Sequence, residues 1–276
     1  MKALWIVCIA GVVMAQTPPP AKQAPAKTAP AKTAPASTAA PAAPKLGPPP
    51  PALLNPAALK AKAPDLYRVK FVTTKGDITV EVHRDWAPLG ADRLYNLVKN
   101  KYFTDCSFYR YVPGFIVQFG SSAWPQVTKA WENAKIKDDP LKESNKKGTL
   151  TFATSGPDSR TTELFFNLRD NAPLDTTPPG FRPVGMVTEG MDIVEGLYSG
   201  YGDMKEMGGR GPSQSTLAEQ GKPYLDKNFP QLDSIKSATV IFPEATATPA
   251  KTAAPATKSA TPAPKSATPP AATKKQ

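Results

Sequence analysis

The sequence predicts a mainly β domain, a closed antiparallel β-barrel of about eight strands capped by two α-helices and flanked by disordered tails. Three observations support this prediction. Short runs of alternating apolar and polar residues recur along the middle of the chain, turn signals separate them, and the two helical patterns lie far apart. Strands that alternated regularly with helices would instead indicate a parallel sheet. We therefore expect one domain at residues 65–243.

The strands and helices follow from local patterns taken in order. Alternation predicts a first hairpin, with a turn at Lys75-Gly76. Pro88 opens a helix that has apolar residues at i, i+3, i+4 and i+7 up to Val98, and residues 190–198 form a second, short helix. Residues 121–147 are expected to be a long loop, and no element is assigned to an insertion at about 200–230. Strands are expected at residues 67–71, 78–82, 148–153, 164–168, 183–187 and 235–242, and on both sides of the turn in residues 108–120.

Residues 108–120 carry the candidate functional side chains. They read Phe-Tyr-Arg-Tyr-Val-Pro-Gly-Phe-Ile-Val-Gln-Phe-Gly, which is the pattern of a hairpin around a Pro-Gly turn. A three-residue loop would pair Arg110 with Gln118 and place Ile116 on the same face. A two-residue loop would instead place Arg110 opposite Val117. The alternative interpretation is a hairpin without a functional site, in which Arg110 and Gln118 are simply exposed to solvent.

Proline and charge are concentrated in the two tails. Of the 33 prolines, 14 lie at positions 18–64 and six at 249–270, in stretches of Ala, Pro, Lys and Thr. Such composition buries too little apolar surface to offset chain entropy, so residues 16–64 are expected to be a disordered linker and 244–276 a disordered tail. The tails hold 12 of the 34 basic residues, and the remaining 22 face 23 acids, a net of −1 within a chain of +11. We expect no nucleic-acid partner, and at most weak contact of the lysine-rich tails with anionic envelope polymers.

The N-terminus resembles an export signal. Lys2 precedes a short apolar run, and small residues precede a cut before Gln16. Residues 1–15 are therefore expected to be a signal peptide, which places the protein in the periplasm or outside a bacterial cell. A lipid-modified Cys8 is the alternative. Cys106 then has no partner for an internal disulfide and is expected to be a small apolar core residue.

The residue inventory excludes several kinds of chemistry. One histidine, on the polar face of its strand, and one usable cysteine exclude ordinary zinc sites and make a His-assisted nucleophile a poor candidate. No phosphate-binding glycine motif is present. We expect no metal and no cofactor. Rotation about an X-Pro bond needs none of these groups, because the enzyme has only to bind the twisted amide better than the planar one.

Four motifs resemble the cyclophilin-type peptidyl-prolyl isomerases. The 108–120 stretch resembles the family's Phe-His-Arg, Pro-Gly-Phe and Gln-Gly-Gly run. Residues 150–167 read Leu-Thr-Phe-Ala-Thr-Ser-Gly-Pro-Asp-Ser-Arg-Thr-Thr-Glu-Leu-Phe-Phe-Asn and resemble the family segment that ends in Gln-Phe-Phe. Residues 173–175 and 181–194 resemble its Leu-Asp and Phe-Gly-x-Val stretches. The resemblance covers about residues 67–198 and the closing strand.

The resemblance implies roles for particular residues. Arg110 would be the catalytic guanidinium, and Gln118 would orient it or bind the substrate carbonyl. Tyr109 would stand at the family's His position beside them. The expected substrate-binding residues around the proline ring and peptide are Phe115, Ile116, Ala153, Thr154, Glu163, Phe165, Leu174 and Phe181. Substrates would be proline-containing peptides and unfolded exported proteins, and the protein is expected to be a monomer.

Departures from the family pattern leave a second hypothesis open. Glu163 replaces the usual Gln, and could hold Arg110 in place or compete with the substrate for it. Phe119 replaces the first Gly of the family run, and Pro173 replaces a Trp that contacts cyclosporin in many relatives, so we expect weak inhibition by that drug. The leading hypothesis is an isomerase that acts on exported proteins. The alternative is a catalytically weak, proline-peptide-binding or envelope-associated module with the same fold.

Overall fold

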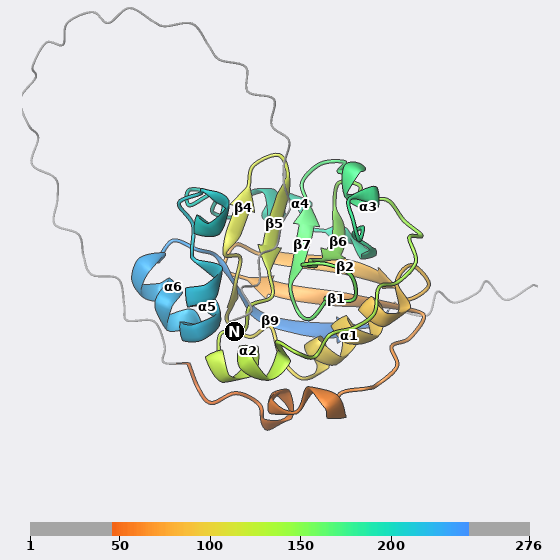
Figure 1. Cartoon of the computed structure of the whole chain (residues 1–276), viewed down its shortest axis with the longest axis horizontal. Coiled ribbons are helices and arrows are strands. Elements are labelled where there is room, and N and C mark those ends of the chain that lie inside the picture. The colour runs from red at the N-terminus through yellow and green to blue at the C-terminus, as the bar shows by residue number, and fades with distance from the viewer. Residues whose placement is uncertain (1–45, 243–276) are drawn as a thin grey trace, which may run out of the picture. The chain divides into compact units, whose positions relative to one another are not determined.

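One nine-stranded antiparallel sheet dominates the computed structural model, which describes residues 46–242 (Figure 1). The expected signal peptide, residues 16–45 of the predicted linker and the whole predicted tail at 244–276 lie outside the described residues. The strand order is β3-β9-β1-β2-β8-β6-β7-β5-β4. The strands are β1 (Leu66–Thr73), β2 (Asp77–His83), β3 (Cys106–Ser107), β4 (Arg110–Val112), β5 (Ile116–Phe119), β6 (Thr149–Phe152), β7 (Leu164–Asn167), β8 (Pro183–Glu189) and β9 (Ser234–Ile241).

The expected closure of the barrel is not confirmed, because the two edge strands of this sheet, β3 and β4, do not pair with each other. Only Phe108 and Tyr109 separate them in the chain, so the backbone bends from one edge of the sheet to the other. The backbone donors at this bend find other partners. The N–H of Phe108 donates to the carbonyl of Asp233 at 2.9 Å, and that of Tyr111 to the carbonyl of Gly202 at 3.2 Å.

The structure has more helices than the two expected. The first expected helix is α1 (Pro88–Lys99), which begins at Pro88 as predicted, and the second is the shorter α4 (Met191–Glu195). The prediction of two helices is wrong because the further segments, of four to seven residues, are too short to show a helical period. They are α2 (Pro125–Trp131), α3 (Pro173–Thr176), α5 (Gln214–Gln220) and α6 (Lys222–Asn228), with 3-10 turns η1 (Pro51–Leu54), η2 (Pro56–Ala58) and η3 (Lys205–Met207).

The insertion at 200–230 and the loop at 121–147 therefore both contain helices. The α5 helix packs against both α2 and α6 (Figure 1). The side chain of Ser213 caps α5 by accepting a hydrogen bond from the N–H of Thr216. Among the helices of residues 46–242, none is both long and apolar enough to cross a membrane.

Residues 46–64 are packed against the domain, so the prediction of a disordered linker is wrong for this part. Leu53 is fully buried in the main core. Two indole N–H groups hold the backbone of this segment: Trp131 donates to the carbonyl of Leu53 at 2.8 Å, and Trp124 to that of Gly47 at 2.6 Å. The prolines here open the 3-10 turns η1 and η2, and one buried leucine and these donors attach the chain to α2.

The β4–β5 hairpin divides its side chains between two faces. Val117 and Phe119 point into the main core. Ile116 and Gln118 point to the opposite face, as the strand period of two requires. Phe119 packs against a group of aromatic rings, namely Phe71, Phe103, Phe108 and Phe166.

Candidate active site

The hairpin register predicted from the sequence is confirmed. Arg110 pairs with Gln118, and Val112 pairs with Ile116. The turn is closed by a hydrogen bond from the N–H of Phe115 to the carbonyl of Val112 at 3.0 Å. Gly114 has φ +66°, a left-handed conformation that glycine adopts without strain. The loop is therefore the three-residue type that brings the Arg and Gln side chains together.

A chain of hydrogen bonds links four side chains on this face. Arg110 Nη1 donates to Gln118 Oε1 at 3.0 Å. Gln118 Nε2 donates in turn to the hydroxyl of Tyr109 at 2.6 Å, and that hydroxyl donates to Glu163 Oε2 at 2.8 Å. Gln118 is thus oriented from both ends, and its amide oxygen faces the guanidinium. Glu163 accepts its hydrogen bond from Tyr109 and not from Arg110. It therefore neither holds Arg110 by direct contact nor competes directly with a substrate for it, the two roles suggested from the sequence.

The carboxylate that contacts Arg110 belongs to Asp203. Arg110 Nε donates to Asp203 Oδ1 at 2.6 Å, and Arg110 Nη2 donates to Asp203 Oδ2 at 3.3 Å. This two-point pairing is the strongest geometry that a guanidinium and a carboxylate form. Sequence reasoning missed Asp203 because it lies in the glycine-rich insertion, where no local pattern indicated an element or a partner.

Glu163 has an unusual electrostatic environment. Burial raises the pKa of its carboxyl from 4.5 to about 7, and hydrogen bonds from Tyr109 and Gln118 oppose that rise only in part. The residue as a whole is half-buried. Burial, with the nearby Glu163 as a second cause, also raises the pKa of the Tyr109 hydroxyl well above its usual value of 10.0. Tyr109 therefore stays a neutral donor at any physiological pH.

A small apolar cluster, separate from the main core, lies next to this polar chain. Gln118 and Phe165 are paired across β5 and β7, so the polar chain and the cluster share one face of the sheet. The rings of Phe165 and Phe181 meet edge to face, with centroids 5.7 Å apart. The cluster consists of Ile116, Ala153, Phe165, Leu174 and Phe181, with Phe115 packed against it. It thus contains six of the eight residues that were expected around the proline ring and peptide, and the two outside it are Thr154 and Glu163.

The two residues expected to meet the peptide backbone are engaged within the protein. The N–H of Ala153 donates to the carbonyl of Glu163 at 2.9 Å. The hydroxyl of Thr154 bonds the carbonyl of Gly156 at 2.6 Å and shares a hydrogen bond with Ser159. The N–H of Ala153 is therefore used by the sheet and is not available to a ligand in this arrangement.

The central side chains of the site are closed to solvent. Arg110 is 1% exposed, and Gln118, Ile116 and Phe165 are fully buried. A peptide can touch these groups only after neighbouring side chains move. Phe115 is the half-buried member of the apolar cluster and forms its solvent side.

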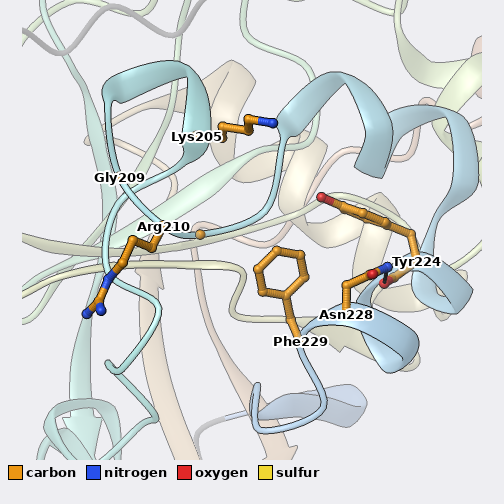
Figure 2. Close-up of a pocket in the computed structure, with 7 residues that line it drawn as sticks. Lys205, Gly209, Arg210, Tyr224, Asn228 and Phe229 are labelled. Atoms are coloured by element: carbon orange, nitrogen blue, oxygen red, sulfur yellow. Dashed lines mark hydrogen bonds between the residues drawn. The ribbon is translucent and has the colours of Figure 1, made fainter.

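A cavity of about 330 Å³ lies elsewhere, within the insertion. Tyr224 and Phe229 face the loop that carries Gly209 and Arg210, whereas the guanidinium of Arg210 points away from the two rings (Figure 2). No residue of the polar chain or the apolar cluster lines this cavity. It is therefore distinct from the candidate active site.

Comparison with known proteins identifies the family. The family described as cyclophilin type peptidyl-prolyl cis-trans isomerase/CLD matches residues 68–218. A peptidyl-prolyl cis-trans isomerase of Acinetobacter baylyi is 35% identical over 131 residues, which cover 46% of this chain and 69% of the relative. Peptidyl-prolyl cis-trans isomerase A of Dickeya dadantii is 32% identical over 133 residues, 46% of this chain and 68% of the relative.

A solved structure is also similar, that of a Cryptosporidium parvum cyclophilin type peptidyl-prolyl cis-trans isomerase. The two structures superpose with a TM-score of 0.47 and 16% sequence identity, and the matched region covers 64% of this chain and 98% of the Cryptosporidium parvum chain. The resemblance of the four sequence motifs is confirmed by the family match, which spans all four motifs and the start of the insertion. The chain belongs to the cyclophilin-type peptidyl-prolyl cis-trans isomerase family.

Proposed function

We propose that this protein accelerates X-Pro rotation by stabilising the twisted amide with Arg110. Amide resonance sets a barrier of about 18–20 kcal/mol to this rotation. The lone pair of the prolyl nitrogen is released as the amide twists, so a guanidinium N–H that donates to this nitrogen favours the twisted state over the planar one. No covalent step and no cofactor is required.

The observation that carries the proposal is the position of Arg110 beside an apolar cluster on one face of the sheet. Gln118 contacts Arg110 at 3.0 Å and is paired with Phe165 across the strands. A proline ring bound among Phe165, Ile116 and Leu174 would thus have its nitrogen near the guanidinium. Glu163, Tyr109 and Gln118 would act through the hydrogen-bond chain rather than by touching the ring.

We further propose that the substrates are proline-containing segments of exported proteins, and that the protein itself is exported. Support for export comes from the sequence pattern of residues 1–15, which lie outside the described residues. N-terminal sequencing of the protein from periplasmic or culture fractions should begin at Gln16. An intact Met1 on protein that stays in the cytoplasm would contradict export and leave the isomerase proposal standing.

One observation favours the second candidate function, a proline-peptide-binding module with little turnover. Arg110 is 1% exposed and already paired with Asp203, so a substrate has to compete with internal contacts. Such a module would bind proline peptides through the same apolar cluster. Turnover therefore distinguishes the two functions, and binding alone does not.

A protease-coupled isomerisation assay on an Ala-Pro peptide tests the proposal. If Arg110 contributes one charge-assisted hydrogen bond of about 1.5–3 kcal/mol in the transition state, Arg110→Ala should slow turnover about 10- to 100-fold. Arg68→Ala is the matched control, because Arg68 also pairs with a carboxylate, Glu81 at 3.0 Å, but on the β1–β2 hairpin. Equal rates for the wild type and Arg110→Ala would leave only the binding module.

A further inference from the structure

Arg110 is held on two sides by different parts of the fold. Asp203, from the insertion, takes the Nε and Nη2 donors, and Gln118, from β5, takes one Nη1 donor. A guanidinium has five N–H donors. Within residues 46–242, three of them are thereby engaged, which leaves one N–H on Nη1 and one on Nη2 for a ligand. These two donors belong to the two terminal nitrogens, where a guanidinium can present paired hydrogen bonds.

Asp203 is itself fixed in place. Its Oδ1 accepts a second hydrogen bond, from the N–H of Met204 at 2.7 Å, and its own carbonyl accepts from the N–H of Gly211 at 2.8 Å. The preceding carbonyl, of Gly202, accepts from the N–H of Tyr111 on β4. The carboxylate therefore sits on backbone that is bonded both to the insertion and to the strand that carries Arg110.

The insertion is anchored to the site by an apolar cluster of its own. Met204 is 1% exposed and packs with Tyr109, Leu217 and Leu225. Tyr109 lies next to Arg110 in the chain and supplies the hydroxyl that orients Gln118. Through Leu217 and Leu225, the α5 and α6 helices thus pack against Met204, which follows Asp203 in the chain, and against Tyr109, which precedes Arg110.

We propose that Asp203 is a positioning residue for Arg110, and that the insertion serves to present it. This inference rests on the proposed isomerase function. An arginine side chain has several rotatable bonds, and a catalytic group that is out of place by even 1 Å can lose about 100-fold in rate. A two-point carboxylate contact restricts these rotations. It also neutralises a buried charge that would be costly if it were left alone.

Three substitutions at Asp203, with one control, test the inference. Asp203→Asn keeps the size of the side chain but removes its charge and one acceptor oxygen, and Asp203→Ala removes both contacts. Asp203→Glu keeps the carboxylate. The control is Asp226→Asn, which removes a carboxylate from α6 of the same insertion, where Asp226 pairs with Lys222 at 2.5 Å.

Each variant is measured for isomerase activity and for the state of Arg110. In Asp203→Asn and Asp203→Ala we expect kcat/KM to fall about 10- to 100-fold, through kcat more than KM, because the bound proline ring does not contact Asp203. Asp203→Glu should recover part of the loss, and Asp226→Asn should match the wild type. In ¹⁵N NMR the Arg110 Nε–H signal, assigned by its absence in Arg110→Lys, should exchange slowly with water in the wild type and fast in Asp203→Ala.

The outcomes separate this inference from the proposed function. If the wild type is active and the Asp203 variants turn over at the same rate or faster, the positioning role is overturned. Faster turnover of the variants would mean that Asp203 competes with the substrate for Arg110. The positioning role would also be overturned if Asp203→Glu, as a folded protein, had no higher kcat/KM than Asp203→Ala. An inactive wild type would overturn the proposed function and this role together. A slowly exchanging Nε–H signal would then show that the ion pair forms in solution and serves binding or stability instead.

Discussion

Replacing Glu163 by Gln should stabilise the protein much more at pH 8 than at pH 5. The Glu163 carboxyl lies among Tyr109, Gln118 and the buried side chains around them, and burial raises its pKa to about 7. A glutamine at this position has no charge to desolvate and can still accept the hydrogen bond that Tyr109 now donates at 2.8 Å.

The sign and size of the effect follow from proton linkage. Between pH 4.5 and about 7 the folded protein holds a proton on Glu163 that the unfolded chain has lost. Stability is therefore highest below pH 4.5 for this group, and is lost as the pH rises through 7. A difference of about 2.5 in pKa corresponds to about 3 kcal/mol. Because Glu163 is half-buried rather than enclosed, we expect about 1–3 kcal/mol.

Urea unfolding of both proteins at pH 5, 6, 7 and 8 measures this difference. All other titrating groups are shared, so they cancel when the two free energies of unfolding are subtracted. The gain from Glu163→Gln should grow from pH 5 to pH 7 and level off towards pH 8. Glu219→Gln, on the exposed side of α5, is the control and should show no such trend. Parallel pH profiles for the wild type and Glu163→Gln would refute the raised pKa of Glu163.

Two further predictions concern the fold. Leu53→Ala should lower the free energy of unfolding by about 2–5 kcal/mol, because Leu53 is fully buried. Leu54→Ala should have little effect, because Leu54 is 48% exposed. Equal effects of the two substitutions in urea unfolding would mean that residues 46–64 do not pack against the domain in solution. Gly120→Ala should cost about 3 kcal/mol, because Gly120 has φ +118° and an added Cβ would lie 2.4 Å from the Thr162 carbonyl oxygen. Gly114→Ala has open space and only the left-handed backbone to oppose it, so thermal unfolding should show a smaller loss, of about 1–2 kcal/mol.

The hairpin and its register could be predicted from the sequence because the information is local. Apolar and β-branched residues alternate on both sides of Pro113-Gly114, and a three-residue loop then determines that Arg110 faces Gln118. The apolar cluster was predicted by resemblance alone. Its members come from β5, β7, α3 and the segments beside them, and nothing in their local sequence separates a residue of this cluster from one in the main core.

The contacts of the insertion could not be predicted for a physical reason. Asp203 and Arg110 are 93 residues apart in the chain, and no periodic pattern relates them. The helices that support Asp203, α5 and α6, have seven residues each, which is two turns and too short for a clear apolar period. Their stability comes from packing, through Leu217 and Leu225 against Tyr109, and packing of this kind is not visible in a local window.

The raised pKa of Glu163 and the ion pair of Arg110 are two consequences of one charge arrangement. Asp203 neutralises the guanidinium, and the hydrogen-bond partners of Glu163 in the described part of the chain, Tyr109 and Gln118, are neutral. Burial of the carboxyl is therefore not offset by a cation, and its pKa rises. If Glu163 were instead the counterion of Arg110, its pKa would fall below 4.5, and Glu163→Gln would destabilise the protein increasingly as the pH rises. The sign of that single pH profile thus tells which of the two carboxylates neutralises Arg110 in solution.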